Sequence, residues 1–446
     1  MADRAINCLA EALAATRFEA LSGPLAARAA DCVLDALGAA AGGLSARSSR
    51  AMAATFLPRA GAGSASVWFS ERRCDPISAA TVNAMAGTAL DVDDGHRRAA
   101  GHPGIAVISA ALAMAEEVDA SVGDLLTATV VGYEAAVRVA LARVPAWHDS
   151  TVSGRWSGVG SAAAAAWLLR LPAPVLAQAM LIAEQHAPRT ASARHHGFAG
   201  SDVKEAIAWS VQTGLLAVEL ARNGFEGYPD TFEQRILYDP GALCSNLDQF
   251  DAISGLFFKP YACCRWMHSA IDGLAALMAR TGLHASAIDA VTVRTFDQAV
   301  GLGNHVAPQS EAEAQFSIPF CLGAVAVHGV GVLTPLDPSL LANAAVIDFA
   351  KKVRVEPAAE MNAVFPGKAP AIIEILAGGE VFLKHVDAAF GDPTNPLRRE
   401  DLQRKLTRLA EGQIPAEQAE RIMRALETAS DRPARRVREA LSGALR

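Results

Sequence analysis

The sequence predicts a mainly α-helical protein that combines a large all-helical domain with a smaller α+β domain. Residues up to about 261 are rich in Ala and Leu, the strongest helix formers, with apolar residues at helical spacing. Beyond about residue 283, β-branched residues and a glycine turn indicate strands. Charged amphipathic sequence returns from residue 402, which predicts helices that pack back onto the first region. We assign 1–265 and 398–446 to the all-helical domain and 266–397 to the α+β domain.

The expected helices of the first region are marked by their periodicity and by residues typical of helix ends. Ser121 and Asp124 are suited to the N-cap and the first turn of one helix. Asn223 and Gly224 are suited to the end of another, because a glycine after the last turn closes many helices. The helices are expected at 21–40, 105–117, 125–144, 161–171, 174–185 and 203–223.

The second region mixes expected strands with expected helices. Two apolar runs, 372–376 and 381–386, flank Gly378 and Gly379, which predicts a hairpin with a tight turn. Further strands are expected at 287–294 and at the end of 349–355, and helices at 315–331 and 338–343. The turn-rich segment 392–396 is expected to link this domain to the final helices.

Bulk composition excludes several classes of protein. A length of 446 residues suffices for two domains. Hydrophobic residues make up 51% and charged residues 20%, which fits a globular chain and not a disordered one. The net charge of -7 argues against nucleic acid as a partner, because phosphate binding needs a basic face. An anionic small molecule stays possible if its pocket is locally basic.

The compartment is predicted from the cysteines and from the apolar segments. Seven cysteines, an odd number scattered through apolar runs, do not form a disulfide framework and indicate a reducing environment. The start of the chain has the periodicity of a helix and lacks the unbroken apolar core of a signal peptide. No stretch reaches the roughly 18 apolar residues of a membrane span. We therefore expect a cytoplasmic protein that is not attached to a membrane.

The first candidate site is an acidic segment with two histidines, at 90–104. Its polar residues are Asp91, Asp93, Asp94, His96 and His102. Clustered carboxylates suit a solvated loop, and they could also bind Mg²⁺ through oxygen ligands. The flanking sequence is apolar, however, and His102 precedes Pro103 at an expected helix start. The partly positive helix end predicts a lowered pKa for His102.

The second candidate site is the segment 258–268. Lys259, Tyr261, Arg265 and His268 bring positive charge and proton-transfer groups into one short stretch. Its two adjacent cysteines are a poor zinc pattern, because zinc sites use spaced pairs. Cys264 is a possible thiol nucleophile beside Arg265, although packing or lining of a pocket is the simpler interpretation.

Two further cations are weaker candidates. Arg155 lies in a glycine-rich loop at 154–160, whose spacing fits neither the P-loop nor the dinucleotide fingerprint. Its guanidinium could pair with a carboxylate. Lys204 is expected in the first turn of a helix capped by Ser201 or Asp202. A lysine there opposes the helix dipole unless an anion is near, although a surface lysine is an equally simple interpretation.

Taken together and in order, several segments resemble the MmgE/PrpD family. They are LDVDDGHRRAAGHPGIAVISAALAMAEE, GSDVKEAIAWSVQTGLLAVELARNGFEG, KPYACCRWMHSAIDG, EAQFSIPF and FGDPTNPL. The family includes 2-methylcitrate dehydratase, cis-aconitate decarboxylase and iminodisuccinate epimerase. The resemblance implies a large helical domain plus a smaller α+β domain, a homodimer, and a small di- or tricarboxylate substrate. It implies no nicotinamide or flavin, and we expect no cofactor and no metal ion.

The resemblance also points to individual residues. Asp91, His102, Lys259 and His268 match positions that line the family's pocket. Three other positions differ from the decarboxylases. Thr151, with His148 nearby, replaces a histidine; Gln212 replaces a lysine; and Cys264 replaces a further histidine. These departures argue against decarboxylation.

The leading hypothesis from the sequence is epimerisation of an iminodisuccinate-like amino polycarboxylate. Lys259 and either His102 or His268 would form the acid/base pair, and Asp91 would orient the histidine. The expected substrate-binding residues are Arg155, Lys204, Tyr261, Cys264, Arg265, Asp93, Asp94 and His96. The alternative is a hydro-lyase acting on a 2-methylcitrate-like acid. A decarboxylase and a non-catalytic carboxylate-binding protein rank after these two.

Overall fold

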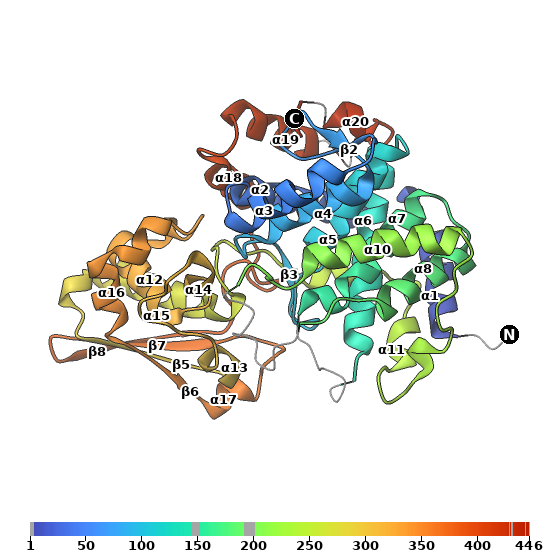
Figure 1. Ribbon diagram of the computed structural model, residues 1–446. Coiled ribbons are helices and arrows are strands. Elements are labelled where there is room, and N and C mark those ends of the chain that lie inside the picture. The colour runs from blue at the N-terminus through green and yellow to red at the C-terminus, as the bar shows by residue number, and fades with distance from the viewer. Residues whose placement is uncertain are drawn as a thin grey trace.

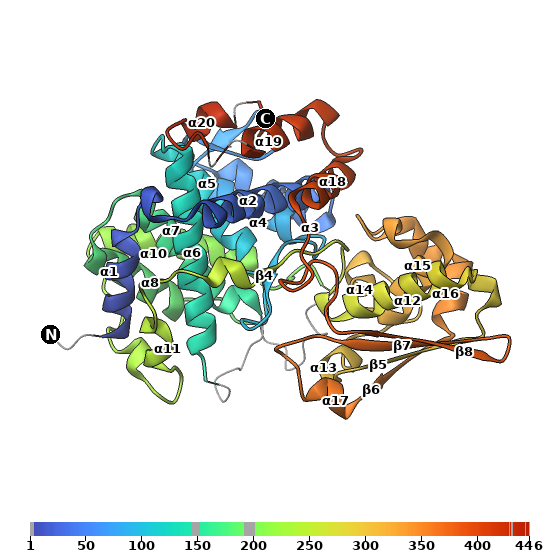
Figure 2. The same cartoon turned by 180° about the vertical axis from the view of Figure 1, so that it is seen from behind.

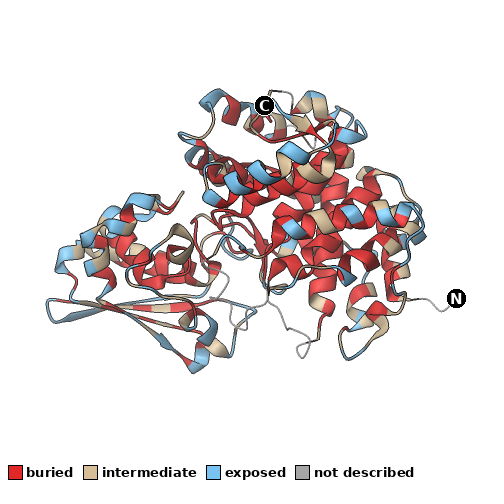
Figure 3. Cartoon of the chain, in the orientation of Figure 1, coloured by how far each residue is buried: buried red, intermediate tan, exposed pale blue. Residues whose placement is uncertain are grey.

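The computed structural model describes residues 4–144, 152–190, 201–427, 429, 431–441 and 443–445. A large helical part and a smaller part with a sheet lie side by side, as Figure 1 shows. Helices account for 56% of the structure and strands for 10%, which confirms the predicted mainly α fold with a smaller α+β part. In Figure 3 the buried residues gather inside each part. They form two hydrophobic clusters, one for each part.

The helices of the large part follow each other closely along the chain. They are α1 (Ala5–Ala15), α2 (Gly23–Gly43), α3 (Arg47–Phe56), α4 (Pro76–Thr88), α5 (Gly104–Glu117), α6 (Val122–Ala142), α7 (Ser157–Leu168), α8 (Ala173–Gln185), α10 (Ile207–Arg222) and α11 (Pro240–Cys244). Ser121 and Asp124 form a capping box on α6, as expected. Gly224 follows α10 with a φ of +84°, which suits a glycine.

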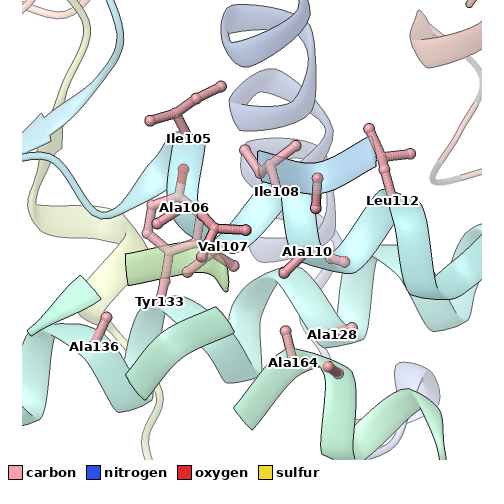
Figure 4. Packing of buried hydrophobic residues seen from close by; sticks show 14 of the residues in the cluster. Ile105, Ala106, Val107, Ile108, Ala110, Leu112, Ala128, Tyr133, Ala136 and Ala164 are labelled. Atoms are coloured by element: carbon pink, nitrogen blue, oxygen red, sulfur yellow. The ribbon is translucent and has the colours of Figure 1, made fainter. Parts of the chain in front are cut away.

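The centre of the large part is the packing of α5, α6 and α7 (Figure 4). Ile105, Val107 and Tyr133 are among the buried side chains there. A Cβ on Gly160 of α7 would lie 2.5 Å from the carbonyl oxygen of Gly132 on α6. Gly160 therefore permits close helix packing. By length and composition α6 could cross a membrane, but it is 94% buried inside the protein, as an internal core helix is.

Two short antiparallel strand pairs lie outside the main sheet. The two-residue strands β1 (Ala65–Ser66) and β2 (Arg73–Cys74) pair with each other. The strand β3 (Gly95–His96) pairs antiparallel with β4 (Leu256–Phe257). β3 lies between the two parts in Figure 1. This pairing brings the segments 90–104 and 258–268 together, although about 160 residues separate them in the chain.

The smaller part is a four-stranded sheet with helices over one face. Its elements are α12 (His268–Thr281), β5 (Ala290–Thr295), α13 (Asp297–Val300), α14 (Glu311–Ala314), α15 (Ile318–His328), α16 (Ala344–Ala350), β6 (Val353–Pro357), α17 (Ala359–Asn362), β7 (Ala371–Ala377) and β8 (Glu380–Val386). The strand order is β6-β5-β7-β8, and β5 with β6 is the parallel pair. Both views show α12, α15 and α16 along one face of the sheet (Figures 1 and 2).

Several expected boundaries of the smaller part shift by a few residues. The β7–β8 hairpin turns at Gly378 and Gly379, as predicted, and both have positive φ. The strand expected at 287–294 begins at Ala290, after a 3₁₀ turn at Ala285–Ala287. The segment 349–355 is divided between α16 and β6, because Phe349 completes the buried face of the helix.

The final helices return to the large part, as Figures 1 and 2 both show for α18. They are α18 (Arg399–Ala410), α19 (Ala416–Glu427) and α20 (Val437–Ala440). α18 packs along α2. Two ion pairs join these helices: Arg399 lies 2.6 Å from Asp31, and Lys405 lies 2.6 Å from Asp35. The C-terminal helices α18 and α19 therefore pack against α2, near the start of the chain.

Candidate active site

Four ionisable side chains meet where the two parts of the protein join. Asp91 and His102 come from the two ends of the segment around β3, and Lys259 follows β4. Lys259 Nζ lies 2.8 Å from Asp91 Oδ1, and His102 Nε2 lies 3.6 Å from the same oxygen. His102 Nδ1 lies 3.6 Å from Asp93 Oδ2. The structure thus brings together Asp91, His102 and Lys259, which sequence reasoning had selected from separate segments.

The backbone defines which nitrogen of His102 can transfer a proton. His102 Nδ1 donates to the carbonyl oxygen of Asp94 at 2.6 Å, because a carbonyl can only accept. Nε2 is therefore the nitrogen left to exchange a proton, and it faces Asp91. The main-chain amide of His102 donates to Ser153 Oγ at 2.7 Å. The imidazole is held from two sides before any substrate binds.

The charges of this cluster shift the pKa values in opposite senses. Burial raises the pKa of Asp91, but the ammonium of Lys259 and then His102 outweigh burial, so the pKa lies below its usual value. Burial is the largest effect on His102 and lowers its pKa, but Asp93, Glu205 and Asp91 together outweigh it, and the net shift is upward. For Lys259, burial lowers the pKa most, but Asp91 and Asp93 together raise it, and the net shift is upward. The lowered pKa that the sequence predicted for His102 is wrong, because the nearby carboxylates dominate over the helix end.

The other two carboxylates of the segment are fully buried. Burial, with Asp91 adding to it, raises the pKa of Asp93 to about 6. Neither carboxylate oxygen of Asp93 has a hydrogen-bond partner among the described residues. Burial and the nearby Asp35 raise the pKa of Asp94 to about 7. Asp94 accepts from the Tyr133 hydroxyl and, at 3.1 Å, from the amide of Gly104, so it supports the start of α5 and not the cavity.

The cluster forms one wall of a cavity of about 300 Å³ between the two parts. Its described lining residues are Asp91, His96, Arg97, Arg98, Ala100, Gly101, His102, Glu205, Phe257, Cys264, Arg265, Trp266, Gln298, Phe316, Phe365 and Pro366. Asp91 and His102 face this space, whereas the buried Lys259 lies behind Asp91. The lining combines a possible proton-transfer pair with several cations, which suits a small anionic ligand.

The arginines of the cavity differ in how their charge is used. Arg97 forms an ion pair with Asp392. Arg265 donates to the carbonyl oxygens of Phe390 and Ala389, at 2.8 and 3.1 Å. Arg98 is exposed at the cavity and has no ion-pair partner among the described residues. Arg98 is therefore the cation best placed to receive a carboxylate. Sequence reasoning quoted this arginine within its segment without choosing it.

His268 and Tyr261 belong to the support of the site. His268 is fully buried, and its Nε2 lies 3.1 Å from the carbonyl oxygen of Cys263. Burial and then Arg265 hold the pKa of His268 well below its usual value. The Tyr261 hydroxyl donates to Asp272 at 2.7 Å. Neither residue lines the cavity, so His102 is the better of the two predicted histidines for proton transfer.

Cys264 and His96 do line the cavity. Burial, together with Asp91, raises the pKa of the Cys264 thiol, which argues against a thiolate nucleophile. Burial and the adjacent Arg98 and Arg97 lower the pKa of His96 to about 4. His96 is therefore a neutral group near pH 7. Its Nδ1 accepts from the amide of Ala99.

Arg155 and Lys204 occupy positions that the sequence did not predict. Arg155 forms a buried ion pair with Glu184 at 2.5 Å and does not line the cavity. Lys204 precedes its helix, since α10 begins at Ile207, and neither Ser201 nor Asp202 caps it. The reason is the left-handed backbone of Lys204, with a φ of +51°.

Lys204 nevertheless belongs to the electrostatic surroundings of the site. Its Nζ donates to Gln315 Oε1 at 2.5 Å. Burial lowers the pKa of Lys204, while Asp91 acts in the opposite sense. Lys204 and Gln315 also line a second cavity, which is larger, at about 490 Å³. We favour the smaller cavity as the active site, because Asp91 and His102 face it.

Two site residues had no signal in the sequence. Glu205 lines the cavity and raises the pKa of His102. Its Oε2 accepts from the main-chain amide of Ser153 at 2.9 Å, and also from the Ser153 hydroxyl. Ser153 in turn holds His102. Of the residues that differ from the decarboxylases, His148 and Thr151 lie outside the described residues. Gln212, on α10, does not line the cavity.

The same carboxylates are also a possible set of metal ligands. Ligand atoms of Asp91, Asp93 and His102 lie within 4.8 Å of one another. Mg²⁺ prefers oxygen ligands in octahedral geometry and retains several waters. Here the ammonium of Lys259 already lies 2.8 Å from Asp91, where a cation would otherwise balance the charge. This geometry fits a lysine-balanced cluster better than a magnesium site.

Comparisons with known proteins identify the family. The model of the MmgE/PrpD N-terminal domain matches residues 7–240, and that of the MmgE/PrpD C-terminal domain matches 261–430. The chain therefore belongs to the MmgE/PrpD family. Among similar proteins is the cis-aconitate decarboxylase-like protein oryM of Aspergillus oryzae, which is 26% identical in an alignment of 403 residues that covers 81% of each chain. Family members are enzymes, dehydratases and decarboxylases among them, which supports an enzymatic role.

Proposed function

We propose that the protein is a cofactor-independent epimerase of an iminodisuccinate-like amino polycarboxylate. The reaction removes the proton from the carbon next to a carboxylate and returns a proton to the opposite face. The observation that carries the proposal is His102 Nε2 at the wall of the cavity, 3.6 Å from Asp91 Oδ1. Asp91 is balanced by Lys259, so the imidazole has a charged neighbour whose ionised state is secured.

His102 is the proposed group that takes the substrate proton. The net upward shift of its pKa favours the imidazolium that forms when His102 takes a proton, and a positioned imidazole can serve as general base and then as general acid. The imidazolium that forms is stabilised by Asp91 and Asp93. Lys259 acts through Asp91 in this scheme, because it is fully buried and does not line the cavity.

An epimerase needs a second proton-transfer group on the other face of the carbon. Cys264 lines the same cavity, and burial raises the pKa of its thiol, so this group is protonated and is the candidate proton donor for the other face. With Cys264→Ala, we expect one stereoisomer of substrate to exchange its α-proton with solvent while inversion stops. Cys244→Ala, outside the cavity lining, is the matched control. Inversion at the normal rate by Cys264→Ala would exclude Cys264 as the second proton-transfer group.

The proposed substrate carries more than one carboxylate. A cavity of about 300 Å³ is at the small end of ligand pockets. Arg98 offers an uncommitted guanidinium at the cavity, and this group pairs with carboxylates through two hydrogen bonds. Positive charge also stabilises the negative charge that develops on the substrate when the proton leaves.

Incubation in D₂O tests the proposed reaction. An epimerase incorporates deuterium at the α-carbon and interconverts stereoisomers with no net loss of water or CO₂. Mass spectrometry measures the first result, and chiral chromatography measures the second. If the folded protein exchanged the α-proton of no iminodisuccinate stereoisomer, the proposal would be refuted.

A hydro-lyase acting on a 2-methylcitrate-like acid is the second candidate. The raised pKa of His102 favours it, since a protonated imidazole can donate to a leaving hydroxyl. In this reaction a base removes the α-proton, the carbon–oxygen bond breaks, and water leaves. The unsaturated product absorbs in the ultraviolet, so a rise in absorbance without CO₂ would favour the hydro-lyase over the epimerase. Release of CO₂ from cis-aconitate would instead favour the activity in the name of oryM.

A further inference from the structure

A lysine from the far end of the chain reaches the loop that carries the acidic residues of the site. Lys405, on α18, is only 4% exposed. Its Nζ donates to the carbonyl oxygen of Val92 at 2.6 Å and to Asp35 Oδ1 at 2.6 Å. Val92 lies between Asp91 and Asp93, so this contact is made within the acidic loop itself.

Asp35 makes the other half of the contact from α2. This carboxylate is 3% exposed, and burial raises its pKa, while the ammonium of Lys405 lowers it. The main-chain amide of Asp94 also stabilises the charged form of Asp35. The ion pair of Lys405 with Asp35 therefore contacts the loop at Val92, and Asp35 lies within electrostatic reach of Asp94.

The loop is one that needs such support. Asp91 has a φ of +51°, in the left-handed region that residues with a Cβ rarely adopt. The carbonyl oxygen of Asp94 also holds His102 Nδ1. The loop between Asp91 and Asp94 thus sets two things: the position of the carboxylates and the orientation of the imidazole.

We propose that Lys405 and Asp35 are positioning residues of the active site, which hold the loop from Asp91 to Asp94 in its working geometry. The final helices of the chain are then a functional part of the site. The expected effect on catalysis rests on the proposed function. The expected effect on the structure of the loop does not, and hydrogen exchange measures it separately.

A second ion pair on the same two helices offers a matched control. Arg399 of α18 lies 2.6 Å from Asp31 of α2 and donates to the carbonyl oxygens of Ala27 and Leu426. Among the described residues, no hydrogen bond or ion pair joins Arg399 to the loop from Asp91 to Asp94. Arg399→Met therefore weakens the contact between the helices in the way that Lys405→Met does, but leaves the support of Val92 in place.

Hydrogen exchange of the ligand-free protein tests the structural side. The variants are Lys405→Met, the neutral double variant Asp35→Asn with Lys405→Met, and Arg399→Met. The double variant avoids an unpaired buried charge and serves if the single variant does not fold. We expect amides 91–94 to exchange roughly tenfold faster or more in the folded Lys405 variants, and at the wild-type rate in Arg399→Met. Unchanged exchange of these amides in the folded double variant would overturn the inference.

Steady-state kinetics test the catalytic side. Misplacing catalytic groups by about 1 Å can cost roughly a hundredfold in rate, so the double variant should lose most of its kcat. Its KM should stay within about twofold, because Arg98 lies outside the supported loop. Kinetics equal to those of Arg399→Met would contradict the positioning role. Absence of turnover by the wild-type protein would instead refute the proposed function, and hydrogen exchange would still decide the inference.

Discussion

At the scale of single residues, one carboxylate organises the site. Asp91 Oδ1 contacts both Lys259 and His102, so an ammonium and an imidazole share its charge. A buried carboxylate is stable only when it is paired, and Lys259 supplies that pairing from behind. The side of Asp91 that faces the cavity is left to His102 and to the ligand. The ionisation of His102 therefore depends in part on Lys259, which does not line the cavity.

Replacement of His102 tests its role in proton transfer. His102→Asn keeps a polar side chain of similar size, so the fold should survive. We expect kcat to fall by roughly 10²- to 10⁴-fold, the usual contribution of one positioned acid or base. Loss of α-proton exchange measures the effect. His284→Asn, at an exposed position, should behave as the wild type. Full exchange by His102→Asn would move proton transfer to another residue.

Replacement of Arg98 tests the recognition of the substrate carboxylate. Arg98→Met removes the charge and the hydrogen bonds but keeps the length of the side chain. A charge-assisted contact contributes about 1.5 to 3 kcal/mol, so KM should rise by roughly 10- to 100-fold. The kcat value should change much less if Arg98 binds substrate and transition state equally. Arg280→Met at the exposed end of α12 is the control. An unchanged KM would exclude Arg98 from the binding site.

Removal of metal ions tests the alternative interpretation of the carboxylates. With Lys259 balancing Asp91, we expect activity to be unchanged after treatment with EDTA and gel filtration. Elemental analysis of the purified protein should find no stoichiometric divalent metal. Activity that disappears with EDTA and returns with Mg²⁺ would show that Asp91, Asp93 and His102 act as ligands.

At the scale of elements, the short pair β3–β4 assembles the site. It is only two residues long in each strand, yet it joins the two segments that carry Asp91 and Lys259. Gly95 makes this approach possible, because a Cβ there would lie 2.4 Å from the ring of Phe257. A strand pair this short depends on close packing around it.

The fit at Gly95 gives a prediction for the element. Gly95→Ala should destabilise the protein by about 1 to 3 kcal/mol, the usual range for overpacking, and should lower kcat/KM as the segments separate. Urea denaturation and the exchange assay measure the two effects. Gly23→Ala is the control, since nothing lies within 4 Å of its added Cβ. Normal activity of Gly95→Ala would show that the site tolerates movement of β3.

At the scale of the whole molecule, a buried charge near the cavity makes stability depend on pH. The pKa of Asp93 is raised from 3.8 to about 6, mainly by burial. As pH rises through this window, the unfolded chain loses its proton before the folded chain does. The carboxyl group therefore destabilises the fold increasingly from about pH 4 to pH 6, and by a constant amount above that.

Asp93→Asn should remove this penalty. A shift of about two pKa units corresponds to about 3 kcal/mol, so the variant should be more stable than the wild type by up to that amount at pH 8. Near pH 3.5 the carboxyl is mostly protonated in both states, and the gain should vanish. Thermal unfolding across pH measures the difference. A variant that is less stable at pH 8 would show that ionised Asp93 is well paired.

Much of the fold followed from local sequence, because periodicity, caps and turns act over a few residues. The Ala-rich helices, the capping box at Ser121 and the glycine hairpin turn are of this kind. The predictions from sequence were wrong where backbone strain or a partner distant in the chain determined the structure. Lys204 interrupts its expected helix with a left-handed backbone, and Arg155 pairs with Glu184, 29 residues away. The homodimer implied by the resemblance stays a prediction.

The sequence alone predicted the fold class, which the structure confirms, and it predicted three residues that meet in the candidate site, Asp91, His102 and Lys259, from residue type, local pattern and family resemblance. Tertiary structure decided how these residues work. It gave His102 a raised pKa where the helix end predicted a lowered one, because the combined electrostatic effect of Asp93, Glu205 and Asp91 exceeds that of burial. It also brought Glu205 and Lys405 to the site from distant segments. Charge and contact act through space, and spacing along the chain does not record them.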